Sequence, residues 1–354
     1  MTAPHRVGIV GSGFGGTVHA PAYTLHPAFE LVAIASPNRA AAIARERNVP
    51  NAFASVEEML AQIDVDVVSV TSPPFDHHHS VLQALAAGKH VLCEKPFAHT
   101  VAQAEEMLAA AERAGTVCAI AHEFRYTPAR RATVELIENE HLGPLREIEI
   151  VIFSKMLRAD ATDRGRGWWF DYERGGGIAQ AVASHAIDLA KYLAGRRPSA
   201  THGFIRTANP SRRDTEGSFT STVDDGVFAL LDFGDGLAGR ITVDATLTIA
   251  QATVAVHGER RSAVASGDNL IAQTLFTIDD DEQNELELTP PSYAKFASVH
   301  PQVPAFLELL DAFADRINGG DARVPSFADG LATQHVLSTL GYGNVEARSM
   351  RQPA

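Results

Sequence analysis

The chain has 354 residues, of which 45% are hydrophobic and 21% charged, as in an ordinary globular protein of about two domains. Its 43 acidic and 30 basic residues give a net charge of −13, which argues against nucleic acid or a membrane surface as the main partner, because both require a basic footprint. Two cysteines cannot form a disulfide framework, and neither a secretory signal nor a long apolar run is visible, so a cytoplasmic protein is expected.

The first third of the chain alternates short β-branched runs with helical patterns. Strand-like runs cover residues 6–10, 29–35, 65–71, 90–94 and 117–121. Helical patterns lie between them, in a stretch that ends near residue 26 and at residues 38–48, 79–87 and 101–114. This alternation predicts an α/β domain, with a doubly wound parallel sheet that carries helices on both faces.

The pattern changes after about residue 124. Helices are expected at residues 128–140 and 177–193, among strand-like runs at 145–153, 199–206, 225–233, 236–246 and 253–257. Short turns such as Phe233-Gly234-Asp235-Gly236 favour hairpins, so we expect an α+β domain with an open, mostly antiparallel sheet. The domains are therefore placed at 1–125 and 126–354, and the C-terminal helices at 303–318 and 327–340 could pack back on the first domain.

A glycine-rich loop follows the first strand and precedes the first helix. It reads Gly11-Ser12-Gly13-Phe14-Gly15-Gly16, which satisfies G-x-G-x-x-G in the context that supports a dinucleotide site. The first glycine permits a tight turn, the second lets the backbone approach a pyrophosphate, and the third allows close helix packing. The helix that follows supplies backbone amides for the phosphates. The alternative interpretation is a plain glycine-rich turn.

The end of the second strand bears on the choice between NAD and NADP. An NAD site usually carries Asp or Glu there, to bind the ribose 2′-hydroxyl. This chain instead reads Ala35-Ser36-Pro37-Asn38-Arg39, and Arg39 with Ser36 could bind a 2′-phosphate. The residues therefore favour NADP over NAD, unless Arg39 is only a solvated residue at the start of a helix.

Several segments together resemble one known family. Residues 87–96 (AGKHVLCEKP), Ser72-Pro73-Pro74 with His77, residues 122–128 (HEFRYTP), the Gly175–Gly177 run with residues 184–188 (SHAID), and residues 327–330 (FADG) carry this resemblance. The chain resembles the glucose–fructose oxidoreductase/inositol dehydrogenase family, also called the Gfo/Idh/MocA type. The matching segments extend from about residue 7 to about residue 340, so the resemblance covers nearly the whole chain.

The resemblance implies a Rossmann domain followed by a substrate domain that associates, through the open face of its sheet, into a homodimer or homotetramer. It also implies an NAD(P)-dependent dehydrogenase or reductase that acts on CH–OH groups of a sugar, cyclitol or related polyol. The residues expected to bind the cofactor are Gly11, Ser12, Gly13, Phe14, Gly15, Gly16, Ser36, Arg39, Ser72, Pro73, His77, Glu94 and Lys95.

Two residues are the candidates for the chemical step. Lys95 follows a strand at its carboxyl end, where open α/β sheets bind ligands, and could stabilise a developing alkoxide. His185 is a candidate general acid and base because histidine titrates near neutral pH. The alternatives are a surface lysine and a structural histidine.

One position departs from the family pattern. Many relatives carry an aspartate four residues before the histidine, where this chain has Ala181, so the proton relay of those relatives is incomplete here. In a continuous helix Ala181, His185, Asp188 and Tyr192 would share one face. Lys95 and His185 could suffice, or Glu123 or Tyr126 could join them. The residues expected to bind substrate are Asp188, Glu123, Arg125, Tyr126, Trp168 and Trp169.

The two tryptophans are expected to pack on sugar rings, with ordinary core packing as the alternative. No metal site is expected, because His77-His78-His79 are adjacent and cannot all face one ion. A non-catalytic NAD(P)-binding regulator on the same fold remains the rival function, since fold alone does not establish activity. A third possibility is an enzyme that retains its cofactor and passes hydride from one sugar to another.

Overall fold

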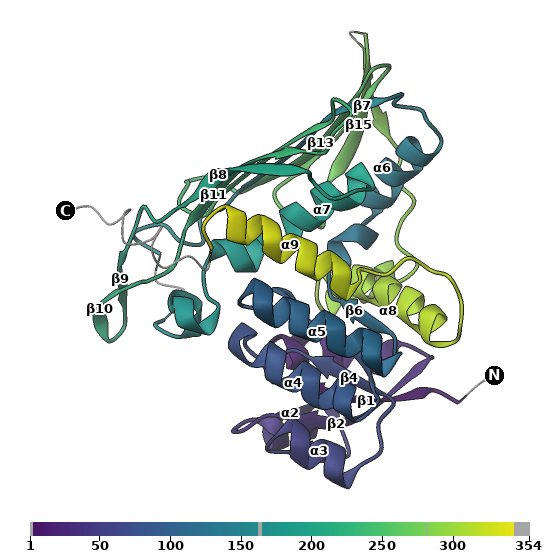
Figure 1. Cartoon of the computed structure of the whole chain (residues 1–354), viewed down its shortest axis with the longest axis vertical. Coiled ribbons are helices and arrows are strands. Elements are labelled where there is room, and N and C mark those ends of the chain that lie inside the picture. The colour runs from purple at the N-terminus through teal and green to yellow at the C-terminus, as the bar shows by residue number, and fades with distance from the viewer. Residues whose placement is uncertain (1–2, 162–164, 281, 343–354) are drawn as a thin grey trace. The chain divides into compact units, whose positions relative to one another are not determined.

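The computed structural model describes residues 3–161, 165–280 and 282–342 (Figure 1). Contacts divide them into two compact units, one from the chain up to Tyr126 with Pro291–Leu331, the other from Thr127–Pro290 with the chain from Ala332 onward. Each unit contains segments that are distant in the sequence. In the described residues, every helix is too short or too polar to cross a membrane.

Within its described residues, the first unit contains a six-stranded parallel sheet in the order β3-β2-β1-β4-β5-β6. Its strands are β1 (His5–Val10), β2 (Phe29–Ala35), β3 (Asn51–Phe53), β4 (Val67–Val70), β5 (His90–Cys93) and β6 (Cys118–Ile120). The chain order reverses between β1 and β4, and such a reversal is where open α/β sheets bind ligands. The Rossmann-like parallel sheet expected for the first part of the chain is confirmed.

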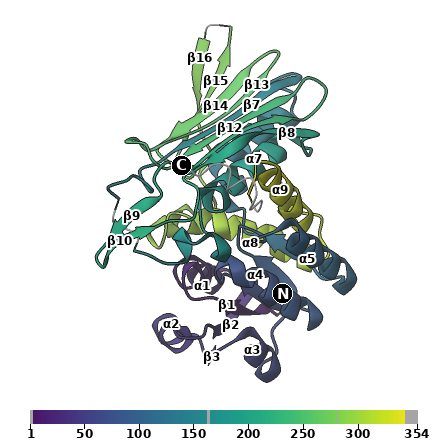
Figure 2. The same ribbon diagram turned by 60° about the vertical axis from the view of Figure 1, so that its left-hand side comes forward.

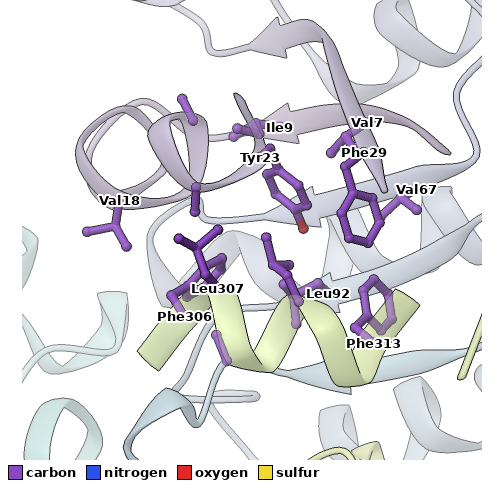
Figure 3. Close-up of a cluster of buried hydrophobic side chains, with 14 of the residues drawn as sticks. Val7, Ile9, Val18, Tyr23, Phe29, Val67, Leu92, Phe306, Leu307 and Phe313 are labelled. Carbon is purple, nitrogen blue, oxygen red and sulfur yellow. The ribbon is translucent and has the colours of Figure 1, made fainter. Parts of the chain in front are cut away.

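Helices cover both faces of this sheet. They are α1 (Ala20–Leu25), α2 (Ala40–Arg47), α3 (Val56–Gln62), α4 (Pro74–Ala86), α5 (Val101–Ala114) and, from the C-terminal part of the chain, α8 (Val303–Ile317). On one face Phe306 and Phe313 of α8 pack against Ile9, Tyr23 and Leu92 (Figure 3). The hydrophobic core on this face therefore depends on a segment about 300 residues from the first strand.

The second unit contains, within its described residues, an eight-stranded sheet in the order β16-β15-β14-β13-β7-β12-β11-β8 (Figure 2). All neighbouring pairs are antiparallel except β12 with β7. The strands are β7 (Leu145–Phe153), β8 (Ala200–Arg206), β11 (Gly226–Asp232), β12 (Ala238–Asp244), β13 (Gln251–Gly258), β14 (Ser262–Gly267), β15 (Thr274–Asp279) and β16 (Glu282–Leu286). The mostly antiparallel sheet expected from the sequence is confirmed.

Alternation along the strands shows which face of this sheet is covered. In β7 the side chains of Ile148, Ile150 and Ile152 are buried, while Glu147, Glu149 and Val151, at the alternate positions, are only half-buried. Helices α6 (Pro128–Glu138) and α7 (Ser184–Ala194) pack against the sheet (Figure 1). A period of two with charged residues on alternate positions is what a sheet with one open face requires.

Some elements differ from the sequence-based expectation. Helix α4 begins at Pro74 rather than residue 79, because the proline ring suits the first helical turn. The helices after the glycine loop and after Gly177 each begin with a π-helical segment, η1 (Gly15–His19) and η5 (Ala179–Ala183). Elements the sequence pattern did not reveal are β3, α3, β14, β15, β16 and the hairpin of β9 (Ser211–Asp214) with β10 (Gly217–Thr220).

Candidate active site

The glycine loop lies against the segment that follows β4. Gly11 has φ +112°, which L side chains rarely adopt, and a Cβ there would overlap Thr71 and lie 2.5 Å from Ser72 N. A Cβ on Gly15 would overlap the Thr71 hydroxyl. A Cβ on Gly13, by contrast, would meet nothing within 4 Å. Gly11 and Gly15 therefore let two loops of the fold meet, whereas Gly13 presents bare backbone on an exposed surface.

The end of β2 carries hydroxyl and cationic groups but no carboxylate. Ser36 Oγ donates to Ser12 Oγ at 3.1 Å, which joins this turn to the glycine loop. Arg39 is exposed at the start of α2. A ribose hydroxyl or its phosphate at this turn would therefore meet two hydroxyls and a guanidinium without a repelling carboxylate.

Two loops at the carboxyl edge of the sheet are joined by a buried histidine. His77 on α4 places Nε2 2.8 Å from Ser72 O and Nδ1 2.8 Å from Pro96 O. Burial lowers the pKa of His77, while its hydrogen bonds to the Ser72 and Pro96 carbonyl oxygens act to raise it. The bond between Lys95 and Pro96 is cis. Ser72 Oγ is buried without a hydrogen-bond partner among the described residues, so a hydroxyl at this edge is open to a ligand.

Glu94 is held by a buried hydrogen-bonded chain that the sequence analysis missed. His19 Nε2 donates to Glu94 Oε1 at 2.8 Å, Ser69 Oγ lies 2.8 Å from His19 Nδ1, and Lys95 N donates to Glu94 Oε2 at 3.2 Å. Burial acts to raise the pKa of Glu94, but the His19 bond and nearby positive charge keep it below its usual value. Ser-His-Glu is also the composition of a hydrolase triad, but Ser69 is buried inside strand β4 rather than in a loop at the carboxyl edge of the sheet, where ligands bind.

Glu123 lies in the short helix η2 (Glu123–Tyr126), directly after β6. It is 1% exposed, and its Oε1 accepts a hydrogen bond of 2.9 Å from Gln302 Nε2. Burial, and then the charge of Glu94, raise the pKa of Glu123 to about 8. Arg125 forms a 3.4 Å ion pair with Asp329, and the Tyr126 hydroxyl donates to Arg323 O at 3.0 Å. Gln302, like His19, carried no sequence signal.

The second unit groups the remaining candidates around η5 and α7. His185 and Asp188 lie on α7, with 4% and 0% of their surfaces exposed, whereas Ala181 lies in η5. The predicted shared face therefore holds for His185, Asp188 and Tyr192 within α7, whereas the step from Ala181 to His185 leaves the π-helical segment and does not keep α-helical spacing.

The tryptophan pair lies against the start of this helix. Trp168 and Trp169 are half-buried in η3 (Trp168–Phe170), with ring centroids 5.4 Å apart. Gly177 N donates to Trp169 O at 3.2 Å, and a Cβ on Gly176 would lie 2.5 Å from Trp168 O. The triple glycine therefore permits close approach of the tryptophan segment to the helix that carries His185. No group of histidine, cysteine and acidic residues in the described part of the chain is arranged to hold a metal ion.

Two family models match this chain. The one described as "Oxidoreductase family, NAD-binding Rossmann fold" covers residues 5–122, and the GFO/IDH/MocA C-terminal domain covers residues 131–264. These residues include both the glycine loop and the helix that carries His185.

Similar proteins extend along most of the chain. The 1,5-anhydro-D-fructose reductase of Ensifer adhaerens is 29% identical and matches 88% of this chain and 89% of its own. The levoglucosan dehydrogenase of Pseudarthrobacter phenanthrenivorans is 28% identical over 92% of each chain. A crystal structure of an oxidoreductase domain protein from Kribbella flavida is 26% identical, with a TM-score of 0.85 over 99% of this chain and 98% of that one.

Proposed function

The chain belongs to the GFO/IDH/MocA family of oxidoreductases, and we propose that it transfers hydride between a nicotinamide dinucleotide and a hydroxyl-bearing carbon of a sugar or related polyol. The observation that carries this proposal is the common edge of the parallel sheet at which the glycine loop, Ser72 and Lys95 lie, after β1, β4 and β5. The similar 1,5-anhydro-D-fructose reductase and levoglucosan dehydrogenase support a sugar as substrate.

The residues of the glycine loop and the three neighbouring loops fit a dinucleotide. The Gly13 backbone and the free hydroxyl of Ser72 suit its phosphates and ribose, while His77 holds the loops in place. When bound, the nicotinamide accepts or donates the hydride. The set that we assign to the cofactor is Gly11, Ser12, Gly13, Phe14, Gly15, Gly16, Ser36, Arg39, Ser72, Pro73, His77, Glu94 and Lys95.

Lys95 and His185 are assigned the chemical step. The Lys95 ammonium polarises the reacting oxygen and stabilises negative charge as it develops, and His185 acts as an acid and base. Substrate hydroxyls and ring faces are bound by Asp188, Glu123, Arg125, Tyr126, Trp168 and Trp169. In this proposal the N-terminal domain binds the cofactor and contributes Glu123 and Arg125 to the sugar site, and the C-terminal domain supplies His185, Asp188 and the two tryptophans.

Turnover on a panel of sugars and polyols, followed by nicotinamide absorbance, tests the proposed function. His185→Asn is expected to lower kcat by a factor of about 10²–10⁴, because it removes an acid–base group. The matched control is His141→Asn, which changes an exposed histidine in the turn after α6 and should leave kcat unchanged. Nucleotide binding without turnover on any member of the panel would instead support the regulator.

We propose NADP as the preferred cofactor, and this choice predicts the effect of two substitutions. Arg39→Ala should weaken NADP about 10- to 100-fold and leave NAD nearly unaffected, because it removes a charge-assisted bond only to the 2′-phosphate. Ser36→Asp should repel that phosphate and move the preference towards NAD. The measurement is the ratio of kcat/KM for the two cofactors. An equal loss for both cofactors in Arg39→Ala would contradict this assignment.

We also propose a homodimer or homotetramer, formed through the open face of the second sheet, and a cytoplasmic location. Exposed apolar side chains on neighbouring strands support the interface, with Phe204 of β8 49% exposed and Leu230 of β11 57% exposed. Two free cysteines, Cys93 and Cys118, suit a reducing compartment. Sedimentation of wild type and Leu230→Asp tests the interface, since a surface charge there should shift the protein to monomers.

A further inference from the structure

The two oxygens of the buried Glu123 carboxyl have different surroundings. Oε1 accepts from Gln302 Nε2 at 2.9 Å, whereas Oε2 is buried and has no hydrogen-bond partner among the described residues. A buried polar atom left unsatisfied costs free energy. The arrangement is therefore best explained if Oε2 finds its partner when a ligand binds.

Glu123 lies at the same edge of the sheet as Lys95. Cys93 at the end of β5 and Ile120 at the end of β6 are register partners in parallel strands. Lys95 comes two residues after Cys93, and Glu123 comes three residues after Ile120. Both residues therefore lie beyond the carboxyl ends of neighbouring strands. Their charges interact, since Lys95 acts to lower the pKa of Glu123.

The partner of Glu123 also connects this position to the glycine loop. Gln302 precedes α8, and His300 two residues earlier packs edge-on against Phe14 with ring centroids 6.3 Å apart. Phe14 belongs to the G-x-G-x-x-G loop. Glu123 therefore lies in one connected group with the residues assigned to the cofactor and with Lys95.

The surrounding charges favour a proton on Glu123 and none on Glu94. Burial and the Glu94 charge raise the pKa of Glu123 to about 8, while Lys95 and the Gln302 bond act against this. Among other groups, Arg125 on the same helix is paired with Asp329, and burial lowers the pKa of His300. Glu94 stays ionised through His19. Active sites that use acid–base chemistry commonly contain one protonated and one ionised carboxyl group, as Glu123 and Glu94 are here.

We propose that Glu123 exchanges the proton of the reacting substrate hydroxyl through Oε2, while Gln302 holds Oε1. In oxidation, the C–H bond would break and its hydrogen would leave with the bonding electron pair, as hydride, to the nicotinamide. The O–H bond breaks as the C=O bond forms, and its proton bonds to Glu123; reduction runs the same steps in reverse. This inference rests on the proposed function and assigns the first proton transfer to Glu123 rather than to His185.

The pH dependence of kcat/KM tests this inference. Because the Glu123 carboxyl is protonated below pH 8 and ionised above it, the oxidation rate should rise through about pH 8 and the reduction rate should fall. Glu123→Gln should remove this limb and lower kcat about 10²–10⁴-fold. Glu94→Gln should move this change in rate to lower pH, because it removes a charge that raises the pKa of Glu123. Gln302→Leu should move it to higher pH, because it removes a hydrogen bond that lowers that pKa. A purely structural role for these residues would not produce shifts in opposite directions.

A second readout does not depend on activity. Infrared difference spectroscopy of the complex with cofactor should show the C=O band of a protonated carboxyl at pH 7, and Glu123→Gln should lack it. Absence of that band in wild type overturns the inference. The inference is also overturned if Glu123→Gln is active and its kcat/KM still changes near pH 8. That result would leave the proposed function standing. Failure of wild type to turn over any sugar or polyol overturns both. If Glu123→Gln does not fold, the opposite shifts of the other two variants decide.

Discussion

Lys95→Met is expected to lower kcat by a factor of about 10²–10⁴ and to weaken nucleotide binding by a much smaller factor. The loss follows because an ammonium that meets developing negative charge stabilises the transition state more than the ground state. Methionine keeps the length and apolar stem of the side chain, and the backbone contact of Lys95 N with Glu94 is retained. Steady-state turnover and direct nucleotide titration on the same preparations separate the two effects.

Lys89→Met is the matched control for this substitution. Lys89 lies just before β5, at the opposite end of the strand from Lys95, and its Nζ is 3.1 Å from an oxygen of the exposed Asp64. A surface ion pair of this kind contributes about 0–1 kcal/mol to stability, so activity should be preserved. Equal losses in the two variants would show that charge near β5, rather than the position of Lys95, explains the effect.

Local signals explain why much of the first unit could be predicted. The glycine spacing, the strand before it and the helix after it are adjacent in sequence, and Glu94-Lys95-Pro96 follows a short buried strand. By contrast His19 contacts Glu94 from 75 residues away, and Gln302 contacts Glu123 from 179 residues away. No periodicity or propensity connects such positions, so these contacts become visible only when the sheet brings the strand ends together.

The elements that were missed are short or lack a clean pattern. Strand β3 has three residues, and β16 reads Glu282-Gln283-Asn284-Glu285-Leu286, which carries almost no apolar alternation. Such strands are specified by pairing with β2 and β15 rather than by their own composition. The π-helical start of the helix at η5 was hidden for a related reason: it depends on contacts such as Ala179 N to Asp224 Oδ2, 45 residues apart.

A pair of alanine substitutions in the glycine loop should separate folding from cofactor binding. Gly11→Ala is expected to destabilise the protein by about 2–4 kcal/mol, because it combines a strained φ of +112° with overlap against the Thr71 backbone. Gly13→Ala is expected to change stability by less than about 0.5 kcal/mol, since its Cβ would meet nothing within 4 Å. Thermal or denaturant unfolding without nucleotide measures this difference.

Nucleotide titration should then single out Gly13→Ala. Relative to the stability that each variant loses, Gly13→Ala should lose more nucleotide affinity than Gly11→Ala. In Gly13→Ala the added methyl group lies where a pyrophosphate approaches the backbone, so affinity should fall at least about 10-fold in a fully folded protein. Each tenfold loss corresponds to about 1.4 kcal/mol of binding free energy that has no counterpart in unfolding. Wild-type nucleotide affinity in Gly13→Ala would mean that the loop does not contact the pyrophosphate. The sequence motif would then reflect only the close approach of Gly11 and Gly15 to Thr71.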